Sequence, residues 1–153
     1  MNILYGKSWF RAKQCFTESW NEVKASKAHS MRHPYAVLIE EMHKKICFIE
    51  FNNDYVGVGF LDQNGREYAS YQFQELESER LFLSMATHRR FEKSAQVCHG
   101  TTYYFKPTGL VTIEEIDISN ENKSSSQSLV DVSINWEKYP SFGDYLSITR
   151  FER

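Results

Sequence analysis

Apolar residues near the start of the chain recur at helical spacing. Five of them are separated by 3, 4, 4 and 3 positions: Trp9, Ala12, Phe16, Trp20 and Val23. Such spacing places side chains on one stripe of a helix. The hydroxyl of Ser8, just before the stripe, can accept a hydrogen bond from a free N–H of the first turn. The pattern therefore predicts a helix over residues 8–24 that packs its apolar stripe against a sheet.

After Pro34 the pattern changes to short runs rich in Val, Ile, Phe and Tyr, bounded by turn residues, which is typical of strands. The predicted strands are Tyr35–Glu40, Ile46–Phe51, Tyr55–Leu61, Glu67–Glu75, Arg80–His88, Thr101–Lys106, Leu110–Ile118 and Val130–Trp136. The last of these has the clearest alternation of apolar and polar residues. Ser119–Ser128 consists almost entirely of polar residues, mainly Ser and Asn, and is predicted to be a mobile loop.

Two turn motifs set the order of strand pairing. Asn64-Gly65 supplies the positive φ angles of a tight hairpin, and Pro107-Thr108-Gly109 is a second hairpin signal. Short connections between strands predict an antiparallel meander of seven or eight strands, curled into a barrel or half-barrel or folded as a sandwich. The expected fold class is therefore α+β, mainly antiparallel β, in a single domain over residues 1–153, with strands between 35 and 136.

The formal net charge of −2 hides an uneven distribution. Residues 1–45 hold 8 Lys and Arg against 4 Asp and Glu, whereas residues 46–153 hold 10 against 16. A general nucleic-acid binder is usually strongly basic, so no nucleic-acid partner is expected. The acidic sheet instead predicts attraction of a basic protein partner, because complementary charge speeds association.

Three observations bear on the compartment. The first residues lack the basic segment and apolar run of a secretory signal, and the apolar stretches fall short of the ~20 residues of a membrane helix. Cys15, Cys47 and Cys98 are odd in number and form no CxxC pair. These features predict a cytoplasmic protein without disulfides or membrane contact, with Cys47 as a small buried residue.

Candidate catalytic and metal-binding residues do not assemble into a motif. His29 and His33 lack a third ligand at a diagnostic spacing, so neither a metal nor another cofactor is expected. Cys98 with His88 or His99 has no sequence context that indicates an activated thiol. Gly57-Val58-Gly59 lacks the rest of a nucleotide-binding motif and predicts a bulge or a bend. The chain is therefore expected not to be an enzyme, although a hydrolase or isomerase with an unrecognised site stays open.

Two groups of acidic residues are candidates for partner binding. Glu75, Glu77 and Glu79 are spaced two residues apart and would share a face if the strand continues beyond Glu75, while Glu115 and Asp117 share a face opposite Glu114. Like charges on an exposed strand either keep an edge solvated or meet a basic partner. We take these six acids as the candidate partner-binding residues. Two basic clusters also occur, Lys7 with Arg11 and Lys13, and His88-Arg89-Arg90 with Lys93.

Three stretches carry a family resemblance. Arg80–Glu92, Gly100–Lys106 and Asn135–Tyr145 resemble segments of small bacterial immunity proteins, which neutralise toxins of contact-dependent inhibition and related polymorphic toxin systems. The resemblance implies a cytoplasmic inhibitor that binds and occludes the C-terminal domain of one cognate toxin, often a nuclease, and has no chemistry of its own. It gives no functional residue and no oligomeric state.

A different class of function also fits the predicted elements. Seven or eight antiparallel strands with many aromatic residues can form a lipocalin-like barrel that encloses an apolar small molecule. A ligand barrel should contain a sizeable cavity lined by Phe and Tyr. An immunity protein should be solidly filled.

Overall fold

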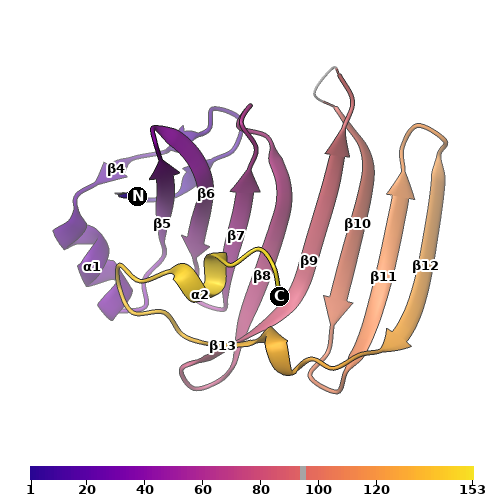
Figure 1. Ribbon diagram of the computed structural model, residues 1–153. Coiled ribbons are helices and arrows are strands. Elements are labelled where there is room, and N and C mark those ends of the chain that lie inside the picture. Colours follow the sequence, from indigo (N-terminus) through magenta and orange to yellow (C-terminus); the bar gives the residue numbers. More distant parts are fainter. Residues whose placement is uncertain (94–95) are drawn as a thin grey trace.

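The computed structural model describes residues 1–93 and 96–153. Within these residues, 11 strands form one antiparallel sheet and two more form a separate small hairpin (Figure 1). The strands are β1 (Asn2–Gly6), β2 (Trp9–Phe10), β3 (Cys15–Phe16), β4 (Ser19–Trp20), β5 (Tyr35–Glu41), β6 (Lys44–Phe51), β7 (Tyr55–Leu61), β8 (Glu67–Glu77), β9 (Arg80–Phe91), β10 (Val97–Phe105), β11 (Leu110–Asp117), β12 (Asn122–Leu129) and β13 (Trp136–Lys138). The helices are α1 (Glu22–Ser30), α2 (Leu146–Thr149) and a 3-10 turn at Ser133–Asn135.

The mainly antiparallel β prediction is confirmed, and the closed-barrel alternative is wrong. From β5 to β12 each strand pairs with the next along the chain, and β1 and β4 extend the sheet beyond β5. In the described part of the chain β4 and β12 are the two ends of this order, so the sheet is open (Figure 1). The short β13 pairs with the beginning of β9.

Cross-strand pairing assigns every side chain to one of two faces, because directly paired residues point the same way. We call the front face the one that carries the paired row Val37, Ile49, Val58, Tyr71, Ala86, Tyr103 and Ile113. The back face carries the adjacent row Ala36, Glu50, Gly57, Gln72, Met85, Tyr104 and Thr112. The front row is mainly apolar, whereas the back row becomes polar after β5. This difference predicts where the core lies.

The main core lies on the front face. The segment from β13 to the C-terminus crosses this face in front of the central strands, and α1 lies beside β5 (Figure 1). Tyr145 and Ile148 from that segment and Ala25 and Ala28 from α1 are buried against the sheet. A smaller core on the back face contains Trp9, Phe48 and Leu61, where the hairpin of β2 and β3 covers the sheet. Strands β10–β12 extend beyond both covers (Figure 1).

The predicted helix over residues 8–24 is wrong over most of its length. Residues 9–20 contain β2, β3 and β4, and the helix begins only after Asn21, whose side chain accepts a hydrogen bond of 2.8 Å from the N–H of Lys24. Trp9 stacks on Phe48 of β6, with ring centroids 5.1 Å apart, as part of a hairpin rather than a helix. Val23, expected on the buried stripe, is 78% exposed. Tertiary packing of the aromatic residues therefore overrides the local spacing.

The end of the chain also differs from prediction. The expected strand over Val130–Trp136 is wrong except at Trp136, where β13 begins, and Ser133–Asn135 form a 3-10 turn. Asp131 accepts the N–H of Ser133 (2.9 Å), and the Asn135 side chain donates to the Leu83 carbonyl (3.0 Å). The predicted mobile loop at Ser119–Ser128 instead contains most of β12. All eight residues of β12 are exposed, so this strand is held by backbone pairing to β11 rather than by burial.

Candidate functional site

Three of the six predicted partner-binding acids form ion pairs within the molecule. Arg32 pairs with Glu79 at 2.6 Å and with Glu75 at 3.3 Å, and its guanidinium lies 3.3 Å from the centroid of the Tyr139 ring. Glu77 pairs with Arg80 at 2.6 Å. These acids therefore help to fix the turn between β8 and β9 and the segment that follows α1.

The other three acids lie elsewhere on the sheet. Glu114 is on the back face, where the Tyr104 hydroxyl donates to it at 3.4 Å, and Asp117 accepts two hydrogen bonds from Asn120. Glu115 lies on the front face, in a cross-strand row that reaches Ala69 of β8. Along β8, Ala69 and Glu75 are separated by about 20 Å, and β8 and β11 by about 14 Å, at normal strand spacings. The structure thus does not bring the six acids together.

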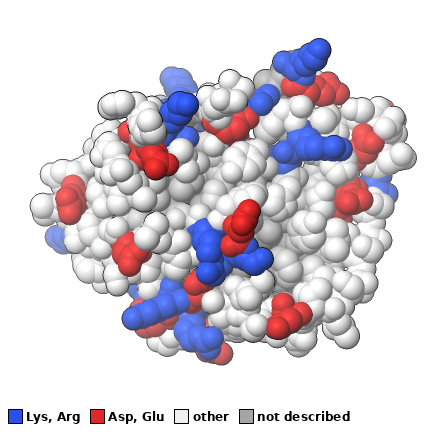
Figure 2. All heavy atoms as spheres, viewed as in Figure 1, with Lys and Arg blue, Asp and Glu red and all other residues white. Residues whose placement is uncertain are grey.

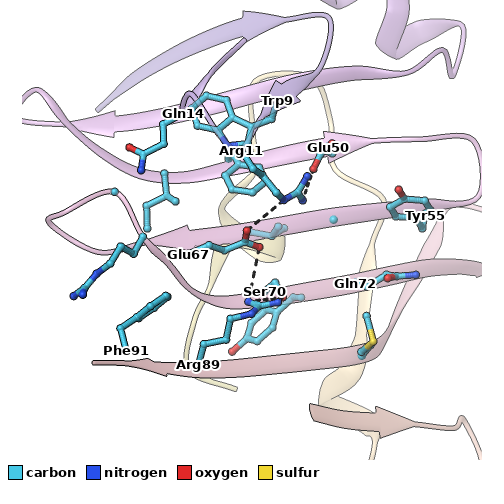
Figure 3. Close-up of a pocket in the computed structure, with 18 residues that line it drawn as sticks. Trp9, Arg11, Gln14, Glu50, Tyr55, Glu67, Ser70, Gln72, Arg89 and Phe91 are labelled. Carbon is cyan, nitrogen blue, oxygen red and sulfur yellow. Dashed lines mark hydrogen bonds and ion pairs between the residues drawn. The ribbon is translucent and has the colours of Figure 1, made fainter. Parts of the chain in front are cut away.

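The back face instead holds a groove of about 590 Å³ beside the hairpin of β2 and β3 (Figure 3). Its floor is formed by Gly57, Ser70, Gln72 and Met85. One wall comes from Trp9, Arg11 and Gln14 of the hairpin, and the other from Arg89 and Phe91 at the end of β9. The groove therefore joins segments that are far apart in the sequence.

A chain of charged groups crosses the middle of the groove (Figure 3). Arg11 pairs with Glu50 at 2.6 Å and with Glu67 at 3.3 Å, and Glu67 lies 4.0 Å from Arg89. Arg89 also donates to the Ser70 hydroxyl at 3.3 Å. Burial lowers the pKa of Arg11, but the two carboxylates outweigh it and raise that pKa overall. Acidic and basic side chains therefore alternate across the groove, in the order Glu50, Arg11, Glu67 and Arg89.

Aromatic rings support the arginines. The Arg11 guanidinium lies 5.0 Å from the centroid of Phe48, whose other neighbour is Trp9. Arg66 lies 4.8 Å from the centroid of Phe91 and donates to Asp62 at 2.8 Å. Packing a guanidinium against a ring restricts its motion while leaving donors at its edge. The groove consequently presents fixed donors and acceptors.

The two glycines of β7 have different roles on the back face. A Cβ at Gly59 would overlap the ring of Phe48, so glycine is required there for Phe48 to pack against Trp9 of the β2–β3 hairpin. A Cβ at Gly57 would have only the Tyr55 ring near it, at 3.7 Å, so this glycine leaves the floor of the groove open. In the Gly-Val-Gly segment, Gly59 therefore permits close packing of Phe48, and Gly57 leaves space at the floor of the groove.

One feature of the sequence, its two basic clusters, indicated residues of this groove. Arg11 and Arg89 belong to the two basic clusters noted above, and the fold places them on either side of Glu67. Glu50 and Glu67 have no such signal in the sequence, because each is one acid in a strand of ordinary composition. Only the pairing of strands brings the four side chains together.

The remaining candidate groups are dispersed. Cys47 is buried, as predicted, and burial raises the pKa of its thiol to about 12. Among residues 1–93 and 96–153, no three His, Cys, Asp or Glu side chains are arranged to hold a metal ion. The helices in that same part of the chain are all too short or too polar to cross a membrane.

The comparisons with known proteins identify no relative. Neither family models, nor curated proteins, nor solved structures include one that matches this chain.

Proposed function

We propose that this chain is an immunity protein, which binds and occludes the C-terminal domain of a cognate bacterial toxin in the cytoplasm. The resemblance on which this rests falls on β9, on β10 and on the segment from Asn135 to Tyr145. The observation that carries the proposal is the groove on the back face. It offers Arg and Tyr side chains in fixed positions, and these residue types are enriched among those that dominate the binding energy of protein interfaces.

The back face beyond the groove is suited to extend the contact. Tyr55 at one end of the groove and Tyr104 on β10 are each 40% exposed. Tyr104 also holds Glu114, one of the predicted partner-binding acids, on this same face. A partner that covers the groove would therefore meet alternating charges, aromatic rings and one acid from β11. The mechanism is steric occlusion of the toxin, with charge complementarity that selects the partner.

The first test is to identify the toxin. If the reading frame lies directly downstream of a large toxin gene, the C-terminal domain of that toxin should be captured by this chain in a pull-down. Calorimetry then measures the affinity of the pair. Absence of binding to that domain would overturn the proposal.

Matched charge reversals locate the interface. Arg89→Glu in the groove should weaken binding at least about ten-fold, because the new carboxylate faces Glu67 and repels an acidic group of the partner. Glu77→Lys, at the β8–β9 turn, should change affinity by less than about two-fold, as expected for a surface ion pair remote from the contact. Tyr55→Ala gives a second groove variant that leaves the ion pairs intact. The reverse result would place the interface on the acidic turn.

A further inference from the structure

A second groove, of about 450 Å³, lies on the front face. It runs between the C-terminal segment and the part of the sheet formed by β9, β10 and β11. In Figure 2 the right-hand part of this face is largely free of charged side chains, with acids and bases around its rim. The two grooves therefore lie on opposite faces and differ in chemistry.

Aromatic rings form the walls of the front groove. Tyr71 stacks on Phe151 at 6.2 Å and 10°, and Tyr103 stacks on Phe105 at 6.2 Å and 10°. His88 lies between the two pairs, nearly perpendicular to Tyr103 (86°) and to Phe151 (85°). Val111 and Ile113 of β11 complete the apolar lining. The result is a slot with ring faces and ring edges on its walls.

Apolar surface remains uncovered around this slot. Phe151 is 39% exposed and Ile134 is 52% exposed, although both lie next to the main core. A contiguous exposed apolar patch on a folded protein usually marks a binding site. The volume of the slot falls within the range of small-molecule pockets, roughly 300–1,000 Å³.

Two of the three charged residues that line the groove already have partners, and the third, Glu152, is exposed to solvent. Arg153 donates to Glu137 at 2.6 Å and to the Ser147 carbonyl at 2.9 Å, and Asp131 accepts the N–H of Ser133 at 2.9 Å. An ionic ligand would have to compete with these contacts. The charge balance of the slot therefore favours a neutral occupant.

Two polar groups of the lining have no hydrogen-bond partner in the described part of the chain, the buried Nε of Arg153 and the ring of His88. The Tyr71 hydroxyl donates to the Phe151 carbonyl, but His88 makes no hydrogen bond to the protein in the described part of the chain. Burial, with a smaller effect of Arg89, lowers the pKa of His88, so its ring is neutral at pH 7. A neutral imidazole offers one donor and one acceptor. A ligand group placed against it would therefore find a hydrogen-bond partner in an apolar setting.

We propose that the front groove binds a neutral small molecule that is largely aromatic or aliphatic and carries one hydrogen-bonding group directed at His88. The walls bury the apolar part of the ligand between ring faces. His88 fixes its orientation. This site is separate from the proposed toxin contact on the back face.

Two isoleucines of β11 provide a matched test with the fluorescent probe 1-N-phenylnaphthylamine, which is neutral, aromatic and carries one N–H. Ile113 faces the groove, whereas Ile116 lies on the back face of the same strand. Ile113→Glu should weaken probe binding at least about ten-fold, because it buries a carboxylate against the ligand. Ile116→Glu should leave the affinity within about two-fold of the unmodified chain. Equal affinity in the two variants would overturn the proposal.

A second variant tests the polar contact and does not introduce a charge. His88→Leu keeps the wall apolar and should weaken binding of this probe about five-fold, the value of one hydrogen bond of about 1 kcal/mol. Pyrene, which has no hydrogen-bonding group, should bind the two proteins equally. Loss of both probes in His88→Leu, with an unchanged thermal unfolding curve, would show that His88 only shapes the wall.

The alternative occupants give different results. If a second copy of the chain fills the slot, light scattering should detect a dimer that Ile113→Glu converts to a monomer, and this would contradict the small-molecule proposal. If the toxin uses the slot, Ile113→Glu should abolish its binding while Arg89→Glu does not. Toxin binding that depends on Arg89 and probe binding that depends on Ile113 would support the two proposals separately.

Discussion

Arg11 and Glu50 form an ion pair of 2.6 Å that fastens the hairpin of β2 and β3 to β6. A second arginine from the basic N-terminal segment, Arg32, pairs with Glu75 and Glu79 near the turn between β8 and β9. The uneven charge along the chain is thus partly neutralised within the fold. Four of the acids that predicted a basic partner, Glu50, Glu67, Glu75 and Glu79, instead help to attach the first 32 residues to the sheet.

The ion pairs of Arg11 should contribute modestly to stability. Arg11→Gln should lower the free energy of unfolding by about 0.5–1 kcal/mol, because Glu50 loses its arginine partner and Glu67 keeps only Arg89, at 4.0 Å. High salt should reduce this difference through screening. Lys13→Gln is the control, since Lys13 only approaches the ring of Phe10, at 5.9 Å. Urea unfolding curves that shift equally for the two variants would contradict the assignment.

The two glycines of β7 should respond differently to the same substitution. Gly59→Ala should lower the free energy of unfolding by about 1–3 kcal/mol, because the methyl group displaces the ring of Phe48 and with it Trp9. Gly57→Ala should change it by less than about 0.5 kcal/mol, since the new methyl meets only open space and the Tyr55 ring. Chemical denaturation of the two single variants measures both effects. Equal losses would show that strand propensity, not contact with Phe48, decides the outcome.

The strands of the meander could be predicted because each carries its own local signal. Tyr55–Leu61 has the predicted limits, and Asp62 in the turn that follows it donates its N–H to the Arg66 carbonyl at 2.9 Å. Of the two residues predicted to have positive φ in this turn, Gly65 does (+75°) and Asn64 does not. Alternation arises where one face of a strand is buried. The alternation of apolar and polar residues in the sequence therefore indicates which side chains belong to the core on the front face.

The predictions are wrong where a strand buries none of its side chains, or where apolar residues are buried by contacts with distant parts of the chain. β12 buries none of its side chains, so its sequence resembles a loop, and only the pairing of Asn122–Leu129 with β11 makes it a strand. Trp9 and Phe16 fit a helical stripe, but they pack against Phe48, which a local pattern cannot reveal. The groove on the back face likewise depends on Arg11 meeting residues of β6, β8 and β9. These contacts join residues far apart in the sequence, so a local sequence pattern cannot predict them.

The turn between β5 and β6 leaves room for stabilisation. Met42 and His43 are its two central residues, with φ of 50° and 63°, and Met42 is 87% exposed. Positive φ at both central positions is the geometry that Asn-Gly adopts most readily. The double substitution Met42→Asn with His43→Gly should therefore raise the free energy of unfolding by about 1–2 kcal/mol. A thermal unfolding midpoint that stays the same or falls would contradict this expectation.

Two half-buried histidines should make stability depend on pH. Burial is the main cause that lowers the pKa of His29 and of His88 below the ordinary 6.5, with Arg32 and Arg89 adding to it. A histidine with a lowered pKa in the folded state binds protons less readily than it does in the unfolded chain. Its stabilising contribution is therefore present above pH 6.5 and is lost as the pH falls through the lower, folded-state pKa.

The free energy of unfolding should consequently decrease between about pH 7 and pH 5, a range above that in which most carboxylates titrate. Replacing His29 and His88 together with Gln should flatten this part of the curve. His29 also bonds the Tyr35 hydroxyl at 2.8 Å, so the double variant should start from a lower stability at pH 7. The slope against pH, not the absolute value, is thus the measurement that decides. A slope equal to that of the unmodified chain would assign the acid sensitivity to other groups.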